Sequence, residues 1–272
     1  MNRYLVSRTL PTALWLCISL AVSAQEFIPA QPRGGDKEAK EFINQEIIYP
    51  KEALDKSIEG IVTFDFMINS EGLVKNLTVT KPVNNLLEQE ATRLFKYLIW
   101  QPAIYRGKAV ESKRNFSIDF SVRRYRKLCK ERGYTSIPAP ALQVDQSGSV
   151  YQFRYTDVQP SPVFERPGMD MTDFMKENFH YPENALRMDI TGTVRLNFVV
   201  EPNGHVSNLM VIDHVGAGCS EEAIRLIKLL HFSPGMVYGQ AVRVNMSIPI
   251  TFGLSTDGSY KVSPAAGGTT FQ

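Results

Sequence analysis

Residues 49–72 read YPKEALDKSIEGIVTFDFMINSEG, and residues 181–204 read YPENALRMDITGTVRLNFVVEPNG. The second stretch repeats the first after a shift of 132 positions, and the match continues without a gap as far as Phe120 and Phe252. About a third of the aligned positions are identical. Such identity without insertions indicates a duplication, and a repeat of this length indicates two whole domains rather than a solenoid of short units.

The apolar pattern inside each copy predicts the same order of elements: helix, strand, strand, helix, strand. In the first copy, apolar residues alternate with polar ones over residues 62–68, which is typical of a half-buried strand. A glycine-containing turn at residues 70–72 leads to a second strand. A period of 3.6 residues then predicts a helix from residue 85. The last strand is expected over Asn115–Val122. A further helix is predicted at Gly35–Glu46, before the first strand.

We therefore expect an α+β protein of two tandem domains, each a three-stranded antiparallel sheet with helices on one face. A right-handed crossover from the second strand places the third strand beside the first, at an edge of the sheet. Three local features refine this fold. Val74 falls out of alternation, which indicates a bulge; Asn85 with Glu88 resembles a capping box; and Gly60 is expected to end the short helix that Tyr-Pro opens.

The domain boundaries follow from the repeat and from changes in composition. The chain divides into a signal peptide (1–24), a linker (25–41), a first domain (42–125), a basic and proline-containing linker (126–160), a second domain (161–255) and a flexible tail (256–272). Between the two copies, Arg123–Arg132 is expected to be a solvated helix, and Val150–Tyr155 a strand that docks on the second domain.

The amino-terminal segment has the features of a secretory signal. Arg3 and Arg8 precede an apolar stretch of 11 residues, and small residues end the segment before Gln25. A membrane-spanning helix needs about 20 apolar residues, so the stretch is short for an anchor, and an uncleaved anchor is the alternative. Without its first 24 residues the chain keeps 28 of its 30 basic side chains against 28 acidic ones. A net charge of zero gives no electrostatic footprint for nucleic acid.

Neither copy shows a pattern typical of catalysis or of metal binding. The four histidines all lie in the second copy, at spacings that fit no zinc site. Cys219 falls in the column of Leu87, so we expect a packing residue rather than a reactive thiol. There is no phosphate loop and no nucleophile motif. The sequence therefore predicts no enzyme, no catalytic residue, no metal ligand and no cofactor.

The spaced motif shared by both copies resembles the carboxy-terminal domain of the TonB family of energy transducers. The residues that carry this resemblance most clearly are Tyr49, Pro50, Gly60 and Gly72 with their counterparts Tyr181, Pro182, Gly192 and Gly204. The resemblance implies a periplasmic domain that binds the TonB box, a short segment of outer-membrane receptors, and so supports transport. It implies binding by β-augmentation, in which an extended peptide adds to an open sheet edge. The expected edge strand comprises Asn115, Phe116, Ser117, Ile118, Asp119, Phe120 and Val122.

Three roles are open at this point. About 17 residues separate the expected signal from the first domain and extend to at most about 60 Å, which is short for the family's spacer. We therefore favour a peptide-binding accessory protein over a membrane-anchored transducer. A non-catalytic envelope scaffold is the third role, with Arg123–Arg132 as a contact to peptidoglycan or to another envelope protein. Membrane contact is expected only through an uncleaved amino terminus.

One difference between the copies predicts a functional asymmetry. Pro249 stands in the last strand of the second copy, where the first copy has Ser117. Proline is tolerated in sheets where its missing N–H would point outward from an edge. It removes one donor for a guest strand, so we expect the first domain to be the better peptide receptor. In the alternative, the two domains pack edge to edge and neither binds a guest.

Overall fold

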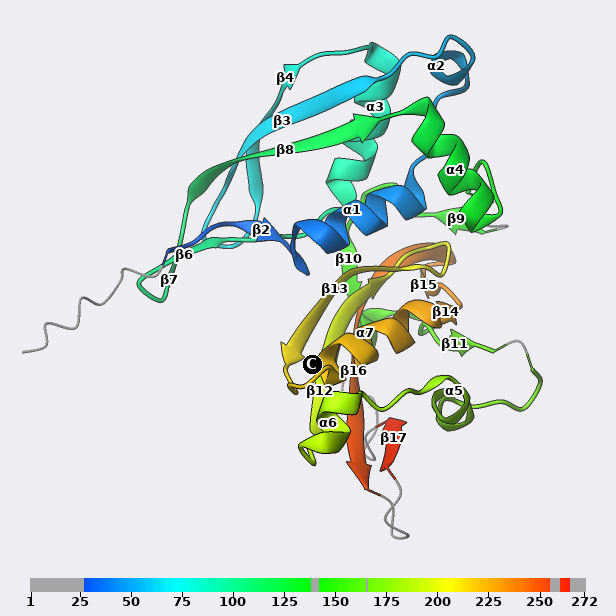
Figure 1. Cartoon of the computed structure of the whole chain (residues 1–272). Coiled ribbons are helices and arrows are strands. Elements are labelled where there is room, and N and C mark those ends of the chain that lie inside the picture. Colours follow the sequence, from blue (N-terminus) through cyan, green and yellow to red (C-terminus); the bar gives the residue numbers. More distant parts are fainter. Residues whose placement is uncertain (1–26, 138–141, 165, 255–259, 265–272) are drawn as a thin grey trace, which may run out of the picture.

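The computed structural model describes residues 27–137, 142–164, 166–254 and 260–264. The expected signal peptide lies outside these residues. The described chain forms two units, one above the other in Figure 1, and each contains the predicted central sheet with helices against one face. It is a mixed α and β protein with antiparallel pairing in both central sheets.

The first domain has the predicted element order. Its central sheet has the strand order β4-β3-β8, so the third strand lies beside the first at an edge. The strands are β3 (Gly60–Ile68), β4 (Val74–Lys81) and β8 (Ser112–Phe120). The helices are α1 (Gly35–Glu46), α2 (Lys51–Asp55), α3 (Asn85–Tyr97) and α4 (Val122–Arg132). Short strands extend the unit: β1 (Phe27–Ile28), β2 (Gln31–Pro32), β5 (Trp100–Gln101), β6 (Ala103–Tyr105) and β7 (Lys108–Val110).

The core of the first domain lies between the sheet and its helices. Alternate residues of β3 and β8 point inward, and the helical face of α3 covers them. Rings gather at the centre, with Phe66 about 4.7 Å from Trp100 and 4.9 Å from Phe95 between centroids. Burial of each such side chain contributes about 1.5–3 kcal/mol, so this cluster fixes which face of β8 turns inward.

The second domain repeats this core and adds strands to it. Its sheet has seven strands rather than three, with β12 central between β13 and β16. Its main elements are α5 (Met171–Asn178), α6 (Glu183–Arg187), β12 (Gly192–Val200), β13 (Val206–Asp213), α7 (Cys219–Leu229) and β16 (Gln240–Leu254). The smaller elements are β9 (Gln143–Val144), β10 (Val150–Gln152), η1 (Phe153–Tyr155), β11 (Pro162–Val163), β14 (His231–Phe232), β15 (Gly235–Val237) and β17 (Tyr260–Pro264).

The expected linkers and tail hold ordered elements. Residues 27–41, expected as linker, contain two short strands and much of α1, because α1 supplies Phe42 and Ile43 to the core. The expected strand over Val150–Tyr155 is a strand only to Gln152 and then turns into η1. Within the expected flexible tail, residues 260–264 form β17, and the other residues of that tail lie outside the described part of the chain.

Local features differ slightly from their predicted positions. The register of β3 against β4 does shift, but the residue with a left-handed backbone is Asn76, two positions after Val74, with φ 53°. Its counterpart Asn208 has φ 49°. Asparagine tolerates this conformation better than most residues, which explains why both copies carry it. The cap of α3 is Asn84 rather than Asn85, and Gly60 begins β3 instead of ending a helix.

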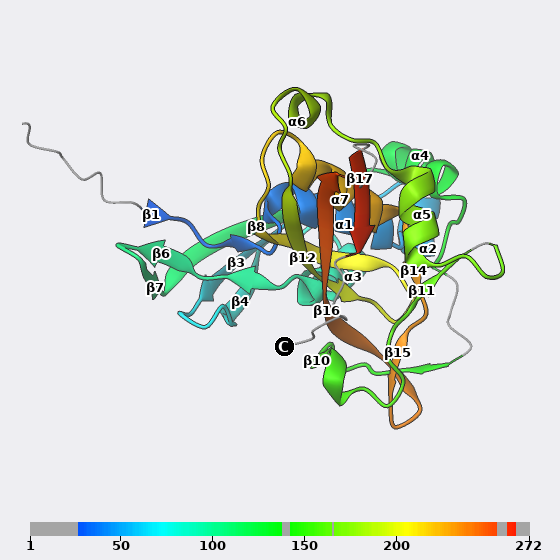
Figure 2. The same ribbon diagram turned by 90° about the horizontal axis from the view of Figure 1, so that it is seen from below.

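The two domains meet over the outer face of the second sheet, which we define as the face opposite α7, and also along β13, where Lys228 of α7 pairs with Glu38 and Glu41 of α1. The side chain of Asn208 accepts a hydrogen bond from Ile99 N (2.8 Å) and donates to the carbonyl of Tyr97 (3.1 Å). Arg33 donates to Asn197 and Asn245 on the same face. Figures 1 and 2 show α1 lying against this sheet, with β8 on the far side of the first domain's core. The domains therefore do not pack edge to edge through β8.

Candidate functional site

Among the described residues, the edge of β8 away from β3 has no neighbouring strand, although the carbonyl oxygen of Asp119 near its end accepts a hydrogen bond from Arg124. Nine residue pairs join β8 to β3, from Gly60 opposite Phe120 to Ile68 opposite Ser112. No strand among the described residues pairs with the other side of β8. A strand edge of this kind presents unpaired N–H and C=O groups, which can receive another extended segment.

The side chains of β8 divide into two rows. Phe116, Ile118 and Phe120 are buried in the core, whereas Asn115, Ser117 and Asp119 are exposed. Of the predicted edge residues, these six lie on β8. Val122 does not, because Ser121 caps a helix and Val122 is the first residue of α4.

The second copy shows which backbone groups of β8 face outward. Ser117 lies opposite Thr63, and Pro249 lies opposite Arg195 at the equivalent position. Because proline has no N–H to give to β12, this is a position where the N–H of the strand points away from its neighbour. Outward groups recur at every second residue of an antiparallel strand. The N–H groups of Asn115, Ser117 and Asp119 therefore face the open edge.

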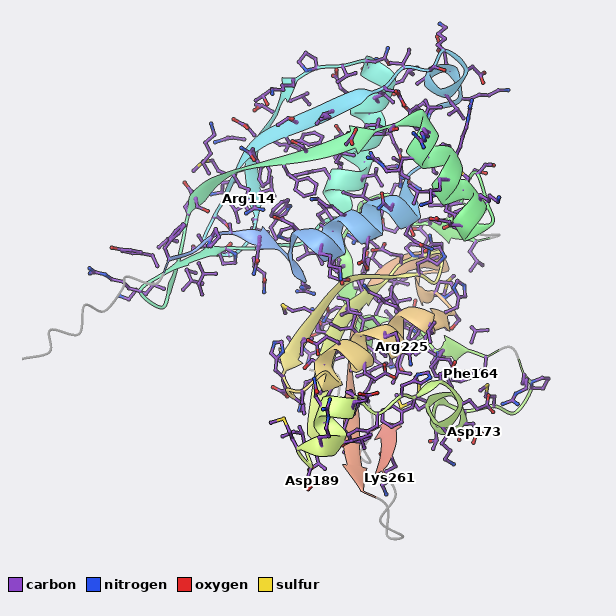
Figure 3. All side chains as sticks on the ribbon, in the orientation of Figure 1. Arg114, Phe164, Asp173, Asp189, Arg225 and Lys261 are labelled. Atoms are coloured by element: carbon purple, nitrogen blue, oxygen red, sulfur yellow. The ribbon has the colours of Figure 1, made fainter. Side chains whose placement is uncertain are left out.

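The equivalent edge of the second domain is covered by the chain itself. The strand β10 pairs parallel with Arg243–Asn245, and β17 pairs antiparallel with Ile250–Leu254. Figure 3 labels Lys261 on β17, beside the end of β16. Between these two strands only residues 246–249, which include Pro249, have no strand partner on this side among the described residues.

The segment after the last strand decides whether the carboxyl-terminal part of the edge is covered. After β8, the side chain of Ser121 accepts a hydrogen bond from Arg124 N and starts α4. After β16, the chain comes back as β17. Residues 255–264 of the second copy read STDGSYKVSP, which combines turn residues with a short β-favouring run.

The helix α4 is fixed to the first domain and is not a loose linker helix. Tyr125 is buried, with its ring 5.2 Å from that of Tyr49. At the other end of α4, Arg132 donates hydrogen bonds to the carbonyls of Gln45 and Ile47, both at 2.9 Å. These carbonyls belong to the carboxyl-terminal end of α1, so Arg132 caps that helix. The position of α4 relative to β8 is therefore set by both ends.

Comparison with protein families agrees with this architecture. The family described as Gram-negative bacterial TonB protein C-terminal matches residues 45–122 and again residues 177–254. The two matches cover more than half of the chain. The chain belongs to this family. A search of curated proteins finds no match to it.

Membership of the TonB carboxy-terminal family places the chain among the domains of the Gram-negative envelope that act with outer-membrane receptors in transport, a class that is not enzymatic. The predicted duplication of this domain is confirmed, because the family matches once in each copy. Among the described helices, none has both the length and the apolar character needed to cross a membrane.

The tyrosine of the TonB motif joins the helical layer to the end of the edge strand. The hydroxyl of Tyr49 donates to the carbonyl of Ile58, and its ring meets that of Phe120 edge-on at 5.8 Å. Burial, together with the nearby Glu59 and Asp119 carboxylates, raises the pKa of Tyr49 to about 12. In the second copy, Tyr181 donates to Ile190 in the same way. These tyrosines therefore pack against the end of the last strand and help to hold it in place.

The glycines of the TonB motif stand where side chains would clash. Gly72 has φ 84°, and a Cβ there would lie 2.5 Å from the carbonyl oxygen of Trp100. Gly204 has φ 82°, and its Cβ would lie 2.1 Å from the carbonyl oxygen of Phe232. The shared turn thus packs directly on the backbone that leads toward the last strand.

A Glu–Arg ion pair that both copies share was not predicted from the sequence. Glu90 accepts a hydrogen bond from Ile48 N at 2.8 Å and pairs with Arg93, which donates to the carbonyl of Glu46. Glu222 and Arg225 do the same for His180 N and the carbonyl of Asn178. The identical Glu-x-x-Arg spacing in both copies was the available signal. The pair closes the end of the preceding helix, so it supports the scaffold.

The remaining reactive side chains are accounted for by packing. Cys219 is fully buried, and burial raises the pKa of its thiol. Both Cys129 and Cys219 are free thiols. Within the described ranges, no three His, Cys, Asp or Glu side chains gather into a group that could hold a metal ion.

Proposed function

We propose that the protein is a periplasmic TonB-like accessory protein that binds the TonB box of outer-membrane receptors on β8 of its first domain. The observation that carries this proposal is the contrast between the two edges. Within the described ranges no strand covers this edge at any of the nine residues of β8, whereas the chain's own strands cover most of the equivalent edge.

The second domain supports the chemistry of this proposal. Its edge already carries one parallel and one antiparallel strand, so the fold accepts added strands in either direction. A guest on β8 would exchange backbone hydrogen bonds with the outward groups of Asn115 and Ser117 and with the N–H of Asp119, whose carbonyl accepts from Arg124. Each such bond contributes a net 0.5–1.5 kcal/mol or so, and only the surplus over the cost of ordering the peptide appears as affinity.

Titration calorimetry with a synthetic TonB-box peptide tests the site. Ser117→Pro removes one outward donor and should weaken binding by about tenfold, because one hydrogen bond is lost and the proline ring crowds the guest. Pro249→Ser should leave the affinity unchanged. Equal effects of the two substitutions would overturn the assignment to the first domain.

Two controls separate loss of a donor from loss of structure. Proline occupies the same position of the second copy, so the strand geometry accepts it there, and an unchanged melting temperature of Ser117→Pro would confirm this. Ser117→Ala removes the hydroxyl that lies 3.0 Å from that of Thr63 but keeps the N–H. Ser117→Ala should bind as the unmodified protein does.

The main alternative is a membrane-anchored energy transducer, and it turns on the amino terminus. Amino-terminal sequencing of the protein from soluble and membrane fractions distinguishes the two roles. A start at Gln25 in the soluble periplasm supports the accessory role. An intact amino terminus in the inner membrane supports the transducer.

A further inference from the structure

The helix α4 carries a basic stripe at the carboxyl end of the open edge. Arg123, Arg126 and Lys130 are exposed and recur at positions that share one helical face. Among the described residues, no carboxylate forms an ion pair with these three side chains. The other exposed cations of α4 are neutralised, since Arg124 pairs with Asp119 and Lys127 pairs with Glu131. We call Arg123, Arg126 and Lys130 the basic stripe.

The first residue of the basic stripe does not help α4 to fold, although Lys130 in the last turn suits the negative end of the helix dipole. Each of the other α-helices has at least one acidic residue in its first turn, which suits the positive end of the helix dipole. The first turn of α4 has no acidic residue and instead contains Arg123 and Arg124. Asp119 offsets Arg124 only. The uncompensated Arg123 therefore opposes the dipole, so helix stability does not explain its presence.

The basic stripe has a fixed place beside the edge. It begins three residues after the end of β8, and Figure 1 shows α4 at that end of the strand. Tyr125 and Arg132 attach the opposite side of α4 to the domain. From Arg123 to Lys130 the stripe is about 10 Å long, the reach of about three extended residues.

The basic stripe occurs only where the edge is open. The equivalent segment of the second copy contains β17, which covers its own edge. Two features thus coincide in the first domain, a free row of backbone groups and an unpaired row of cations at its end. An extended guest with carboxylates beyond its paired residues would satisfy both.

We propose that the guest of β8 is an acidic-flanked strand, whose Asp or Glu residues extend past Phe120 and pair with Arg123, Arg126 and Lys130. This inference rests on the proposed function, because it assigns the chemistry of the segment bound at the same edge. A guest antiparallel to β8 would place its amino-terminal flank on the stripe, and a parallel guest its carboxy-terminal flank.

Three peptides with the same TonB-box centre test the inference on the full-length protein. One has uncharged flanks, one has three Asp residues on its amino-terminal flank, and one has them on its carboxy-terminal flank. We expect one acidic peptide to bind roughly three- to tenfold tighter than the uncharged one in calorimetry at low salt, since exposed ion pairs are individually weak. The advantage should largely disappear at about 0.5 M salt.

Matched variants locate the effect. Arg126→Gln with Lys130→Gln should abolish the advantage of the acidic peptide and leave the uncharged peptide unaffected. Lys75→Gln with Lys81→Gln removes the same charge from β4, at the opposite edge of the same sheet, and should preserve the advantage. Both double variants should melt at the temperature of the unmodified protein, because all four side chains are exposed.

The outcomes separate this inference from the proposed function. If the three peptides bind equally well and Ser117→Pro still weakens their binding, the preference for an acidic flank is wrong and the assignment of the site to β8 is retained. Failure of all three peptides to bind overturns both. Binding of phosphatidylglycerol vesicles that is lost in the Arg126→Gln/Lys130→Gln variant, with peptide affinities unchanged, would assign the stripe to a lipid surface and also overturns the inference.

Discussion

The edges of β8 and β16 began as the same strand edge in duplicated domains, and they now differ in what covers them. Both strands pair with an equivalent inner strand in the same register. The chain leaves β8 through α4, whereas it returns along β16 as β17. The two edges therefore differ because segments outside the strand, β17 after β16 and β10 before it, cover one edge and not the other.

The outer faces of the two sheets also differ in whether another part of the chain covers them. In the second domain this face carries the buried pair of Arg243 and Glu201, each about 3% exposed, and Arg243 also donates to the carbonyl of Tyr97 at 2.8 Å. The first domain has an exposed Glu111 at the position of Arg243. Only the second domain is built to receive the first on its face. This leaves the first domain with both its outer face and its edge exposed.

The largest expected effect follows from breaking the buried pair. Arg243→Met removes the ion-pair partner of the buried Glu201 side chain and leaves it only the hydrogen bond from Ser207, so we expect the free energy of unfolding to fall by about 3–5 kcal/mol. Glu111→Met, at the equivalent position of the first copy, should change it by no more than about 0.5 kcal/mol. Urea unfolding followed by circular dichroism measures both. Similar values for the two variants would contradict the comparison of the outer faces.

A pH titration examines the tyrosine that holds the end of β8. The folded pKa of Tyr49 is about 12, against about 10 in the unfolded chain. Between these values the unfolded state loses its proton first, so stability falls as the pH rises from 10 toward 12, by about 2–3 kcal/mol at most. Urea unfolding at pH 9 and pH 11 measures this loss, and Tyr49→Phe should reduce it. An equal loss in both proteins would show that other groups cause it.

Removing the covering strand should partly equalise the two edges. Deletion of residues 255–272 exposes the edge at Ile250–Leu254, so we expect a second peptide site. Its affinity should be roughly tenfold below that of β8, because Pro249 lacks one donor. Adding Pro249→Ser should narrow that gap. Calorimetry gives the stoichiometry, and a value that stays at one peptide per chain would show that β17 is not what closes this edge.

Much of this fold could be predicted because the chain contains two copies of the same domain sequence. The alternation in β3 and the helical period in α3 each had a second copy as a check, and the edge position of β8 followed from the handedness of the crossover. Val122 was misplaced because alternation continues into it, and Ser121 reads equally well as a strand residue or as a helix cap. Of the two adjacent asparagines Asn84 and Asn85, the sequence did not indicate which one caps α3.

Of the two strands that cover β16, β10 was predicted as a strand that docks on the second domain, but its place on β16 was not, and β17 was not predicted at all. Both β10 and β17 are short, and each is stabilised by the edge on which it lies rather than by its own pattern. The contacts on the outer face of the second sheet could not be predicted for the same reason. Asn197 and Asn245 can be recognised as interdomain residues only once the fold places Arg33 of the other domain opposite them. Features that the repeat shares were therefore visible in the sequence, and features that distinguish its copies were mostly tertiary.

Residue-resolved amide hydrogen exchange, with and without a TonB-box peptide, tests the central claim most directly. The account predicts that the peptide slows exchange at the outward N–H groups of Asn115, Ser117 and Asp119, by up to about a hundredfold at a peptide concentration 100 times the Kd. Exchange along residues 246–254 should be unchanged. Protection of β16 in place of β8, or of neither strand under conditions where the peptide binds, would contradict it.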